Sequence, residues 1–160
     1  MSFFDVDNII SEVRRNKQYK VKVLVALWRL AQLRQRSLVF SLLFFPVHLL
    51  YWVYSQLLLG VELPVAVECQ GPLIIWHGNG IVVNPAVKLG SCVVLRNGVT
   101  IGNDGYSSGC PVIGDNVEIG ANSVLIGAIS IARRAKIGPT SFVNFDVAEG
   151  EKIISGTLKK

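Results

Sequence analysis

His77 is the residue of this sequence whose side chain is best suited to proton-transfer chemistry near neutral pH. It lies in residues 71–83, which read GPLIIWHGNGIVV. A neutral imidazole accepts a proton close to pH 7 and can therefore serve as a general base. The other histidine, His48, lies in a long apolar run, where we expect an ordinary packed side chain. No serine or cysteine forms an evident pair with a base, so a covalent intermediate is not favoured.

The segments on both sides of His77 repeat with a period of six residues. This period fits neither an α-helix nor an alternating strand. It is typical of a β-solenoid, in which short strands and tight turns stack and each turn directs one aliphatic side chain inward. The inward row comprises Val83, Leu89, Leu95, Ile101, Ile113, Ile119, Leu125, Ile131, Ile137 and Val143, and a second row of small or β-branched residues comprises Ile81, Val87, Val93, Val99, Val117, Ser123, Ile129, Ala135 and Ser141.

The six-residue register slips at His77. The row continues upstream through Leu63, Cys69 and Ile75, but Ile75 and Val83 are eight residues apart. The two extra residues fall in residues 77–80, His-Gly-Asn-Gly. A bulge in a strand redirects a side chain and is often found beside an active site. On spacing alone, a surface loop with a chance histidine remains an equal alternative.

Composition excludes several classes of function. The net charge of +5 is spread along the chain and forms no basic arm, so we expect no nucleic-acid partner; an anionic ligand or membrane surface fits as well. The three cysteines include no CxxC pair, so no metal site is expected. Cys69 and Cys92 occupy repeat positions and are expected to be core thiols. Unpaired thiols and a polar, charged start favour a cytoplasmic location.

Residues 1–60 form an N-terminal segment that we expect to be helical. Residues 19–35 indicate a basic helix, and residues 37–60 carry no formal charge over a length that could cross a bilayer, with a kink at Pro46. The apolar run either packs against other subunits or lies in or on the inner face of the cell membrane, assisted by the cations before it. We favour subunit burial for part of this run and keep peripheral membrane contact open.

Residues 61–150 are predicted to form the solenoid, and residues 151–160 a C-terminal tail. The flat faces of such a short solenoid favour a homo-oligomer. The repeat is interrupted at residues 103–110, NDGYSSGC, whose composition is typical of a protruding loop. Because loops on a rigid scaffold often carry binding residues, this loop is a candidate part of the site.

Four motifs together resemble the serine acetyltransferase family: HGNGIVV at 77–83, VTIG at 99–102, PVIGDNVEIGA at 111–121 and AKIG at 135–138. The resemblance is closest to its short members associated with exopolysaccharide and capsule biosynthesis. It implies a left-handed parallel β-helix, an exception to the usual right-handed crossover. It also implies a trimer or a dimer of trimers, with acetyl-CoA bound between adjacent prisms and no metal.

By this resemblance, His77 is the general base and Glu62, fifteen positions earlier, orients its ring. The family more often has aspartate at that position. The resemblance further implies that turn backbone binds acetyl-CoA, that an N–H near Gly102 or Asn103 stabilises the oxyanion, and that Lys136 and the Lys159–Lys160 tail contact phosphate. The implied cofactor-binding residues are Gly102, Asn103, Gly120, Ala121, Lys136 and Gly138, the last followed by Pro139, which has no N–H to donate.

The protruding loop departs from the family. Serine acetyltransferases carry Arg-His-Pro there, whereas residues 109–111 read Gly-Cys-Pro. We therefore predict an O-acetyltransferase that acts on a sugar, glycan or lipid-linked glycan by direct transfer, with Trp76, Asn79 and Cys110 near the acceptor. The alternatives are a serine O-acetyltransferase and a non-catalytic oligomeric scaffold at a membrane. Zinc-dependent hydratases on the same scaffold need several histidines, and the solenoid has one.

Overall fold

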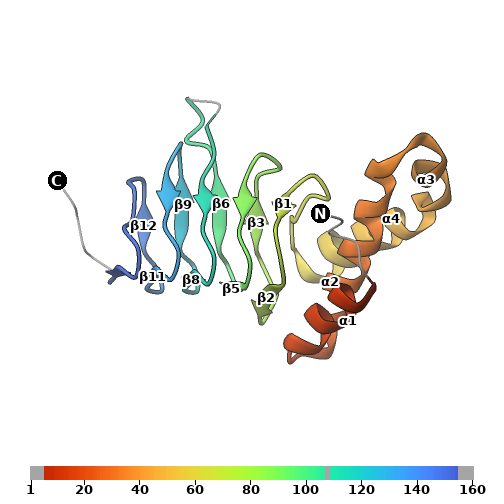
Figure 1. Cartoon of the computed structure of the whole chain (residues 1–160), viewed down its shortest axis with the longest axis horizontal. Coiled ribbons are helices and arrows are strands. Elements are labelled where there is room, and N and C mark those ends of the chain that lie inside the picture. Colours follow the sequence, from red (N-terminus) through yellow and green to blue (C-terminus); the bar gives the residue numbers. More distant parts are fainter. Residues whose placement is uncertain (1–5, 107–108, 155–160) are drawn as a thin grey trace.

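The computed structural model describes residues 6–106 and 109–154, which form a parallel β-solenoid with a helical cap on its N-terminal end (Figure 1). The cap and the described C-terminal residues lie at opposite ends of the molecule. The Lys159–Lys160 tail, predicted to contact phosphate, lies outside the described residues.

The solenoid is built from three parallel sheets, and each coil contributes one short strand to each sheet in turn. The first sheet has the order β1 (Glu68–Cys69), β4 (Lys88–Leu89), β7 (Val112–Ile113) and β10 (Ser130–Ile131). The second has the order β13 (Lys152–Ile153), β11 (Lys136–Ile137), β8 (Glu118–Ile119), β5 (Val93–Arg96) and β2 (Leu73–Trp76). The third has the order β12 (Phe142–Val143), β9 (Val124–Ile126), β6 (Thr100–Gly102) and β3 (Val82–Val83). The predicted solenoid is confirmed, and β13 falls in the segment expected as a tail.

The core of the solenoid consists of the two predicted rows. Every side chain of the aliphatic row is at most 3% exposed, and every residue of the second row is buried. The coils stack so closely that some corners have no room for a side chain. A Cβ at Gly120 would lie 2.4 Å from the backbone N of Pro139 in the next coil, closer than any real contact. Cys69 is buried as expected, whereas Cys92 is half-buried at a corner with φ of +56°, so its assignment to the core was wrong.

The cap contains the helices α1 (Val6–Arg15), α2 (Tyr19–Gln32), α3 (Leu38–Leu43) and α4 (Phe45–Trp52), with a 3-10 turn η1 (Leu33–Arg36) and a π-helical turn η2 (Val53–Leu58). The predicted basic helix is α2. The apolar run of residues 37–60 is broken at Phe44, because Pro46 lies in the first turn of α4, where its missing N–H costs nothing. Within the described residues, no helix combines the length and apolarity needed to span a bilayer.

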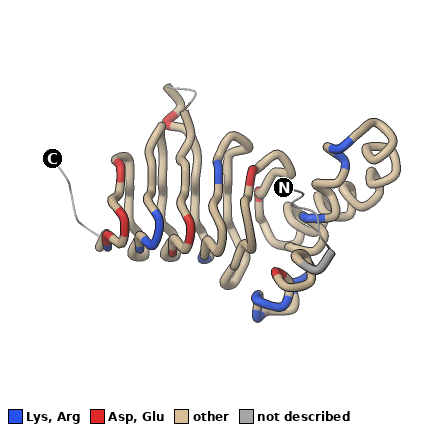
Figure 2. The backbone as a smooth tube through the Cα atoms, in the orientation of Figure 1, with Lys and Arg blue, Asp and Glu red and all other residues tan. Residues whose placement is uncertain are grey.

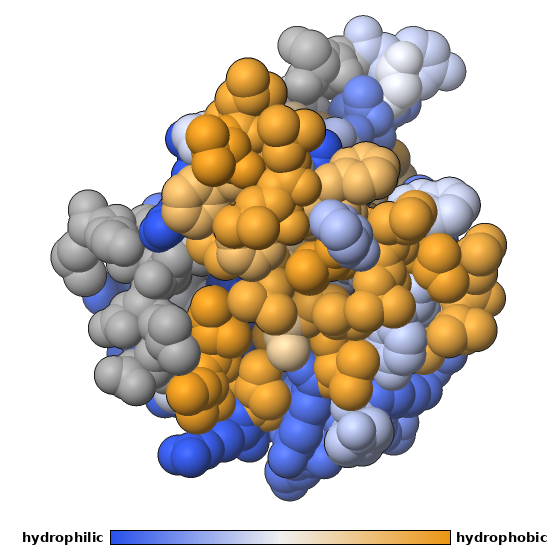
Figure 3. All heavy atoms as spheres, turned by 90° about the vertical axis from the view of Figure 1, so that its right-hand side faces the viewer, coloured by the Kyte–Doolittle hydropathy of each residue, from blue (hydrophilic) through white to orange (hydrophobic). Residues whose placement is uncertain are grey.

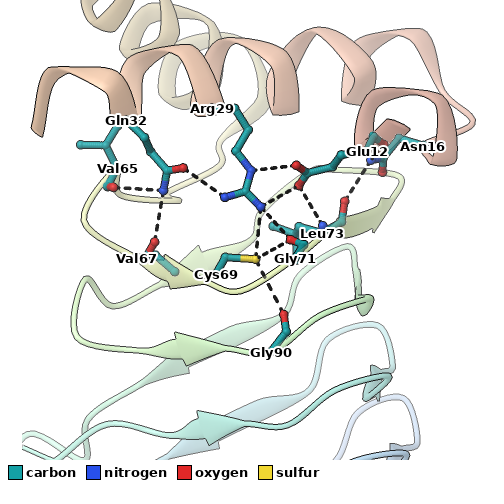
Figure 4. A network of polar contacts seen from close by, with 10 residues as sticks. All are labelled: Glu12, Asn16, Arg29, Gln32, Val65, Val67, Cys69, Gly71, Leu73 and Gly90. Carbon is teal, nitrogen blue, oxygen red and sulfur yellow. Dashed lines mark hydrogen bonds and ion pairs between the residues drawn. The ribbon is translucent and has the colours of Figure 1, made fainter. Parts of the chain in front are cut away.

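A buried polar network fastens α1 and α2 to β2, the edge strand of the second sheet (Figure 4). Arg29 donates to Glu12 through Nε (2.7 Å) and Nη2 (3.1 Å), and its Nη2 also donates to the carbonyl of Gly71 (2.7 Å). Glu12 accepts the backbone N–H of Leu73 (2.8 Å), and Asn16 accepts that of Ile75 (2.8 Å). The helices thus satisfy an edge whose backbone groups would otherwise be unpaired, and they hold α2 against the first coil.

Candidate functional site

His77 lies in the turn that joins β2 to β3, at the corner where the chain passes from the second sheet to the third. The two extra residues that shift the six-residue register lie in this turn. His77 has φ of +70°, and the turn also contains Gly78 at +42° and Gly80 at +64°. A positive φ is uncommon for a residue other than glycine and is concentrated at functional sites. The side chain of His77 is exposed.

The N-terminal end of α2 packs directly against this turn. Gln18 immediately precedes the helix, has extended backbone angles and makes no side-chain cap, so its amide is available to reach His77. Gln18 Nε2 lies 2.9 Å from His77 Nδ1. The Lys20 ammonium donates to the Asn79 side-chain carbonyl. A Cβ at Gly78 would meet Val21 Cγ2 at 3.0 Å, so the helix leaves little space above the turn.

The contact with Gln18 occupies one ring nitrogen of His77. Nδ1 is the bonded nitrogen, and Nε2 has no contact with Gln18. When the Gln18 amide donates its N–H to Nδ1, the ring proton is on Nε2. When the amide is rotated by 180°, its carbonyl accepts Nδ1–H, and the lone pair of Nε2 is free. Gln18 Oε1 is buried without a hydrogen-bond partner in the described orientation. The Nε2 lone pair is the one a general base needs.

Glu62 lies at the cap end of the third sheet, where it forms a parallel bridge with Val82. Its backbone N donates to the carbonyl of Ile81 (2.8 Å) and its carbonyl accepts from Val83 (2.8 Å). Its side chain is exposed. Across residues 6–106 and 109–154, no hydrogen bond or ion pair joins the Glu62 carboxylate to His77. The role expected for Glu62 therefore stays a prediction.

Trp76 and Arg96 form a cation–aromatic pair beside His77. Trp76 is the last residue of β2, 39% exposed, and Arg96 is its register partner in β5. The Arg96 guanidinium lies 4.6 Å from the centre of the Trp76 ring, and the Lys17 ammonium lies 5.6 Å from it. A cation within about 6 Å of an indole face is attracted by it. The indole thus lies beside two positive charges at this corner.

A groove of about 470 Å³ lies on the same edge of the solenoid, at the corners that follow β8 and β11. The predicted cofactor residues Gly120, Ala121, Lys136 and Gly138 all line this groove, so the structure brings these four together. The glycines leave its floor without side chains. Arg96, Lys136 and Lys152 place three cations along it, while Glu118 accepts from the Lys136 ammonium at 2.8 Å, and the groove remains net positive.

The other predicted site residues lie on a different edge. Gly102 ends β6, and Asn103 and Cys110 belong to the connection from β6 to β7, which passes from the third sheet to the first. Cys110 is half-buried, and burial raises the pKa of its thiol above the usual value. The described chain therefore divides the predicted site between two edges, one with His77 and the groove and the other with the protruding loop.

Three residues near the site were not foreseen. Arg96 follows Trp76 by one coil, and the six-residue register could have placed them side by side. Lys152 is the register partner of Lys136, but the two are 16 residues apart and not 18, so the six-residue register could not have paired them. No sequence pattern could have identified Gln18, because its contact with His77 depends on how α2 docks on the first coil.

These features define a class of protein, the hexapeptide-repeat transferases. The family model for bacterial transferase hexapeptide (six repeats) matches residues 110–144. WcaB of Escherichia coli strain K12, named as a candidate colanic acid biosynthesis acetyltransferase, is 30% identical over 137 residues, which cover 85% of this chain and 82% of WcaB. The chain therefore belongs to the hexapeptide-repeat acetyltransferase family and is an acyl-transferring enzyme.

Serine acetyltransferases are also similar to this chain. The enzyme of Helicobacter pylori strain 26695 is 29% identical over 107 residues, which cover 66% of this chain and 63% of the relative. Soybean serine acetyltransferase apoenzyme superimposes with a TM-score of 0.75 at 25% identity, over 91% of this chain and 64% of the other. A serine acetyltransferase in complex with CoA superimposes with a TM-score of 0.70 at 24% identity, over 84% and 54%, and shares the fold. This chain thus spans about half to two thirds of these serine acetyltransferases.

Proposed function

We propose that this acetyltransferase transfers the acetyl group of acetyl-CoA to a sugar hydroxyl in exopolysaccharide or capsule biosynthesis. The observation that carries the proposal is the match to WcaB, which extends over most of both chains. The Gly109-Cys110-Pro111 sequence of the protruding loop supports it, because no cation there is available to hold an amino acid carboxylate. The acceptor is a sugar, glycan or lipid-linked glycan, and the reaction takes place in the cytoplasm.

His77 acts as the general base in the proposed reaction. Nε2 takes the proton of the acceptor hydroxyl as the oxygen attacks the thioester carbonyl carbon, and a tetrahedral oxyanion forms. The intermediate collapses, the carbon–sulfur bond breaks, and the imidazolium returns its proton to the departing sulfur. The products are an acetyl ester and CoA thiol. The acetyl group passes directly to the acceptor without an acetylated protein side chain.

Gln18 is proposed as the group that orients His77. With its carbonyl toward Nδ1–H, it holds the tautomer whose Nε2 carries the free lone pair. A neutral amide stabilises the imidazolium that forms during the reaction less than a carboxylate would. In the proposed complex Glu62 supplies the negative charge, and its exposed carboxylate must rotate toward the ring to do so. Trp76 and Asn79, which flank His77, are proposed to contact the acceptor.

Acetyl-CoA is proposed to lie along the edge that carries both His77 and the groove. His77 belongs to the first coil, and Gly120 and Gly138 lie two and three coils further along the axis. With strands about 4.8 Å apart, this separates the thioester site from the groove by about 10–15 Å. An extended pantetheine arm can run between them over the glycine floor. Lys136 and Lys152 then lie where the CoA phosphates would be.

The residues on the second edge complete the site only in an oligomer. Gly102, Asn103 and Cys110 cannot face His77 of their own chain, because they occupy another corner of the same prism. In a trimer, or a dimer of trimers, the loop edge of one prism meets the His77 edge of the next. A backbone N–H of Gly102 or Asn103 would then point at the oxyanion formed beside the neighbouring chain's histidine.

Serine O-acetylation is the second candidate, because serine acetyltransferases are among the similar sequences and structures. The experiment that separates the two measures CoA release from acetyl-CoA with nucleotide sugars, lipid-linked glycans and L-serine as acceptors. Turnover on a glycan supports the proposal. Turnover on serine alone would contradict it.

A further inference from the structure

The helical cap presents a wide apolar surface to solvent, which we call the apolar cap face. Helix α3 has no buried residue, and the exposed apolar side chains of α3, α4 and η2 form a continuous surface on the end of the molecule (Figure 3). Scattered apolar residues on a protein surface are ordinary, but a contiguous patch marks a contact surface. The face consists of Leu38, Val39, Leu42, Leu43, Phe45, Leu49, Leu50, Trp52, Leu57 and Leu58, which are 43–78% exposed.

Most charges around this face are positive, although the acidic Glu62 lines a pocket beside Trp52. Residues 13–61 contain eight of the sixteen lysines and arginines of the chain and none of its eleven aspartates and glutamates. Figure 2 shows Lys and Arg on both the cap and the solenoid, whereas most Asp and Glu lie on the solenoid. Arg34 and Arg36 lie at the margin of the face, with guanidinium groups 5.4 Å from the Phe45 ring and 6.0 Å from the Phe40 ring. An apolar face with a cationic margin complements acyl chains beneath anionic head groups.

The chemistry of the face fits lipid better than a second copy of this chain. Protein interfaces combine an apolar centre with hydrogen-bonding groups, about one hydrogen bond per 100–200 Å². The apolar cap face consists of Leu, Val, Phe and Trp side chains, and residues 37–60 carry no formal charge. Residues 13–61 contain seven Lys and Arg that are exposed or half-buried. A second copy docked on this face would bring its own seven cations close to those of the first copy. Trp52, 43% exposed, is suited to the boundary between head groups and acyl chains.

The position of the face allows contact with a flat surface. Helix α3 lies at the end of the molecule, with α4 between it and α2, and the solenoid extends away from it (Figure 1). Both edges that carry the proposed site residues run along the solenoid, and at its cap end the His77 turn contacts the N-terminal end of α2. Since no described helix can span a bilayer, the short helices α3 and α4 would lie along the interface with their leucines among the acyl chains.

We propose that the apolar cap face docks this enzyme on an anionic lipid surface. Docking in this way holds the solenoid upright from the membrane and leaves its edges open. The inference goes beyond the proposed function and does not depend on it, because it requires neither acetyl-CoA nor turnover.

The test is sedimentation of the full chain with vesicles of phosphatidylcholine alone and of phosphatidylcholine mixed with phosphatidylglycerol. We expect partition onto the mixed vesicles to be about tenfold stronger or more, and to weaken as salt is added. The double variant Leu42→Asp/Leu49→Asp changes residues that are 71% and 51% exposed and should lose binding. Phe142→Asp, at a residue 55% exposed on the solenoid, is the matched control and should bind as the wild type does.

The mass of each variant in solution, measured by light scattering, identifies the alternative occupant. Wild type and double variant of equal mass, with vesicle binding lost in the variant, support docking on lipid. A lower mass for the double variant, with no wild-type binding to either vesicle, would overturn the proposal and assign the face to a second copy. Equal binding to both vesicles would also overturn it, since the cationic margin would then contribute nothing. Acetyl transfer, assayed without vesicles, reports separately on the proposed function.

Discussion

Replacement of Gln18 tests whether the docking of α2 positions the imidazole of His77. Gln18 and His77 share one contact of 2.9 Å between neutral groups, and no other side chain bonds the ring among the described residues. Gln18→Ala removes this contact and leaves the fold intact, because Gln18 precedes α2 and makes no helix cap.

The expected loss follows from the type of bond. A neutral hydrogen bond contributes about 0.5–1.5 kcal/mol net, which corresponds to a two- to twelvefold change in a rate or equilibrium. If the bond orients the base, the loss falls on kcat, since the ring must hold its orientation while the hydroxyl proton is transferred. The KM for acetyl-CoA should not change, because the groove lies two to three coils away.

Gln18→Glu separates positioning from a structural role. A carboxylate 2.9 Å from the ring nitrogen accepts Nδ1–H and stabilises the imidazolium that forms. We expect this variant to keep the wild-type kcat or exceed it, because the carboxylate holds the same ring nitrogen and adds a countercharge. Steady-state CoA release measures kcat for each variant.

Two results would refute this account of Gln18. The first is an unchanged kcat in Gln18→Ala with a normal melting temperature. The second is a Gln18→Glu variant as slow as Gln18→Ala, which would mean that the amide acts through packing and not through Nδ1. Lys20→Ala, which removes the neighbouring contact to Asn79, is the control for a general loosening of the turn.

Three further predictions concern the fold and the groove. Glu12→Gln should lower the free energy of unfolding by about 3–5 kcal/mol in urea denaturation, because Arg29 is then left buried without a countercharge. The control is Glu118→Gln, which breaks an exposed ion pair and should lower the free energy of unfolding by less than about 1 kcal/mol. Lys136→Ala should raise the KM for acetyl-CoA about two- to fivefold with kcat unchanged, as expected for one exposed phosphate contact, and an unchanged KM would remove Lys136 from the site. Burial raises the pKa of the Cys69 thiol, so iodoacetamide at pH 8 should modify it slowly in the native protein and rapidly in urea; equal rates by mass spectrometry would show that it is accessible.

The sequence was sufficient to predict the solenoid because the signal is local and repeated. Each coil buries the same kinds of residue, so the two rows could be read directly, and a single slip of register located the His77 turn. The same stacking explains why Gly120, Ala121, Lys136 and Gly138 line one groove: equivalent corners of successive coils lie one above another. The positive φ of Cys92 was not predicted by the repeat, because Cys92 occupies a left-handed corner that tolerates several residue types.

Contacts between the cap and the solenoid could not be predicted in this way. The bonds from Glu12 to Leu73 and from Gln18 to His77 join residues about sixty positions apart, and they depend on how α1 and α2 dock. The apolar run was foreseen as one stretch, but Pro46 lies where one helix must end and the next begin. The edge on which each predicted site residue lies could not be predicted either, because the motifs show which turns matter and not which corner each turn occupies.

The measurement that tests the central proposal most directly is CoA release from acetyl-CoA by the wild type and by His77→Ala and His77→Asn, with the glycan and L-serine acceptors in parallel. Asparagine tolerates the positive φ of this position better than alanine, so it controls for strain in the turn. We predict turnover on a glycan, a loss of about 10²–10⁴-fold in both variants, and unchanged acetyl-CoA binding by calorimetry. Wild-type rates in variants that still bind acetyl-CoA would contradict the assignment of His77 as the base.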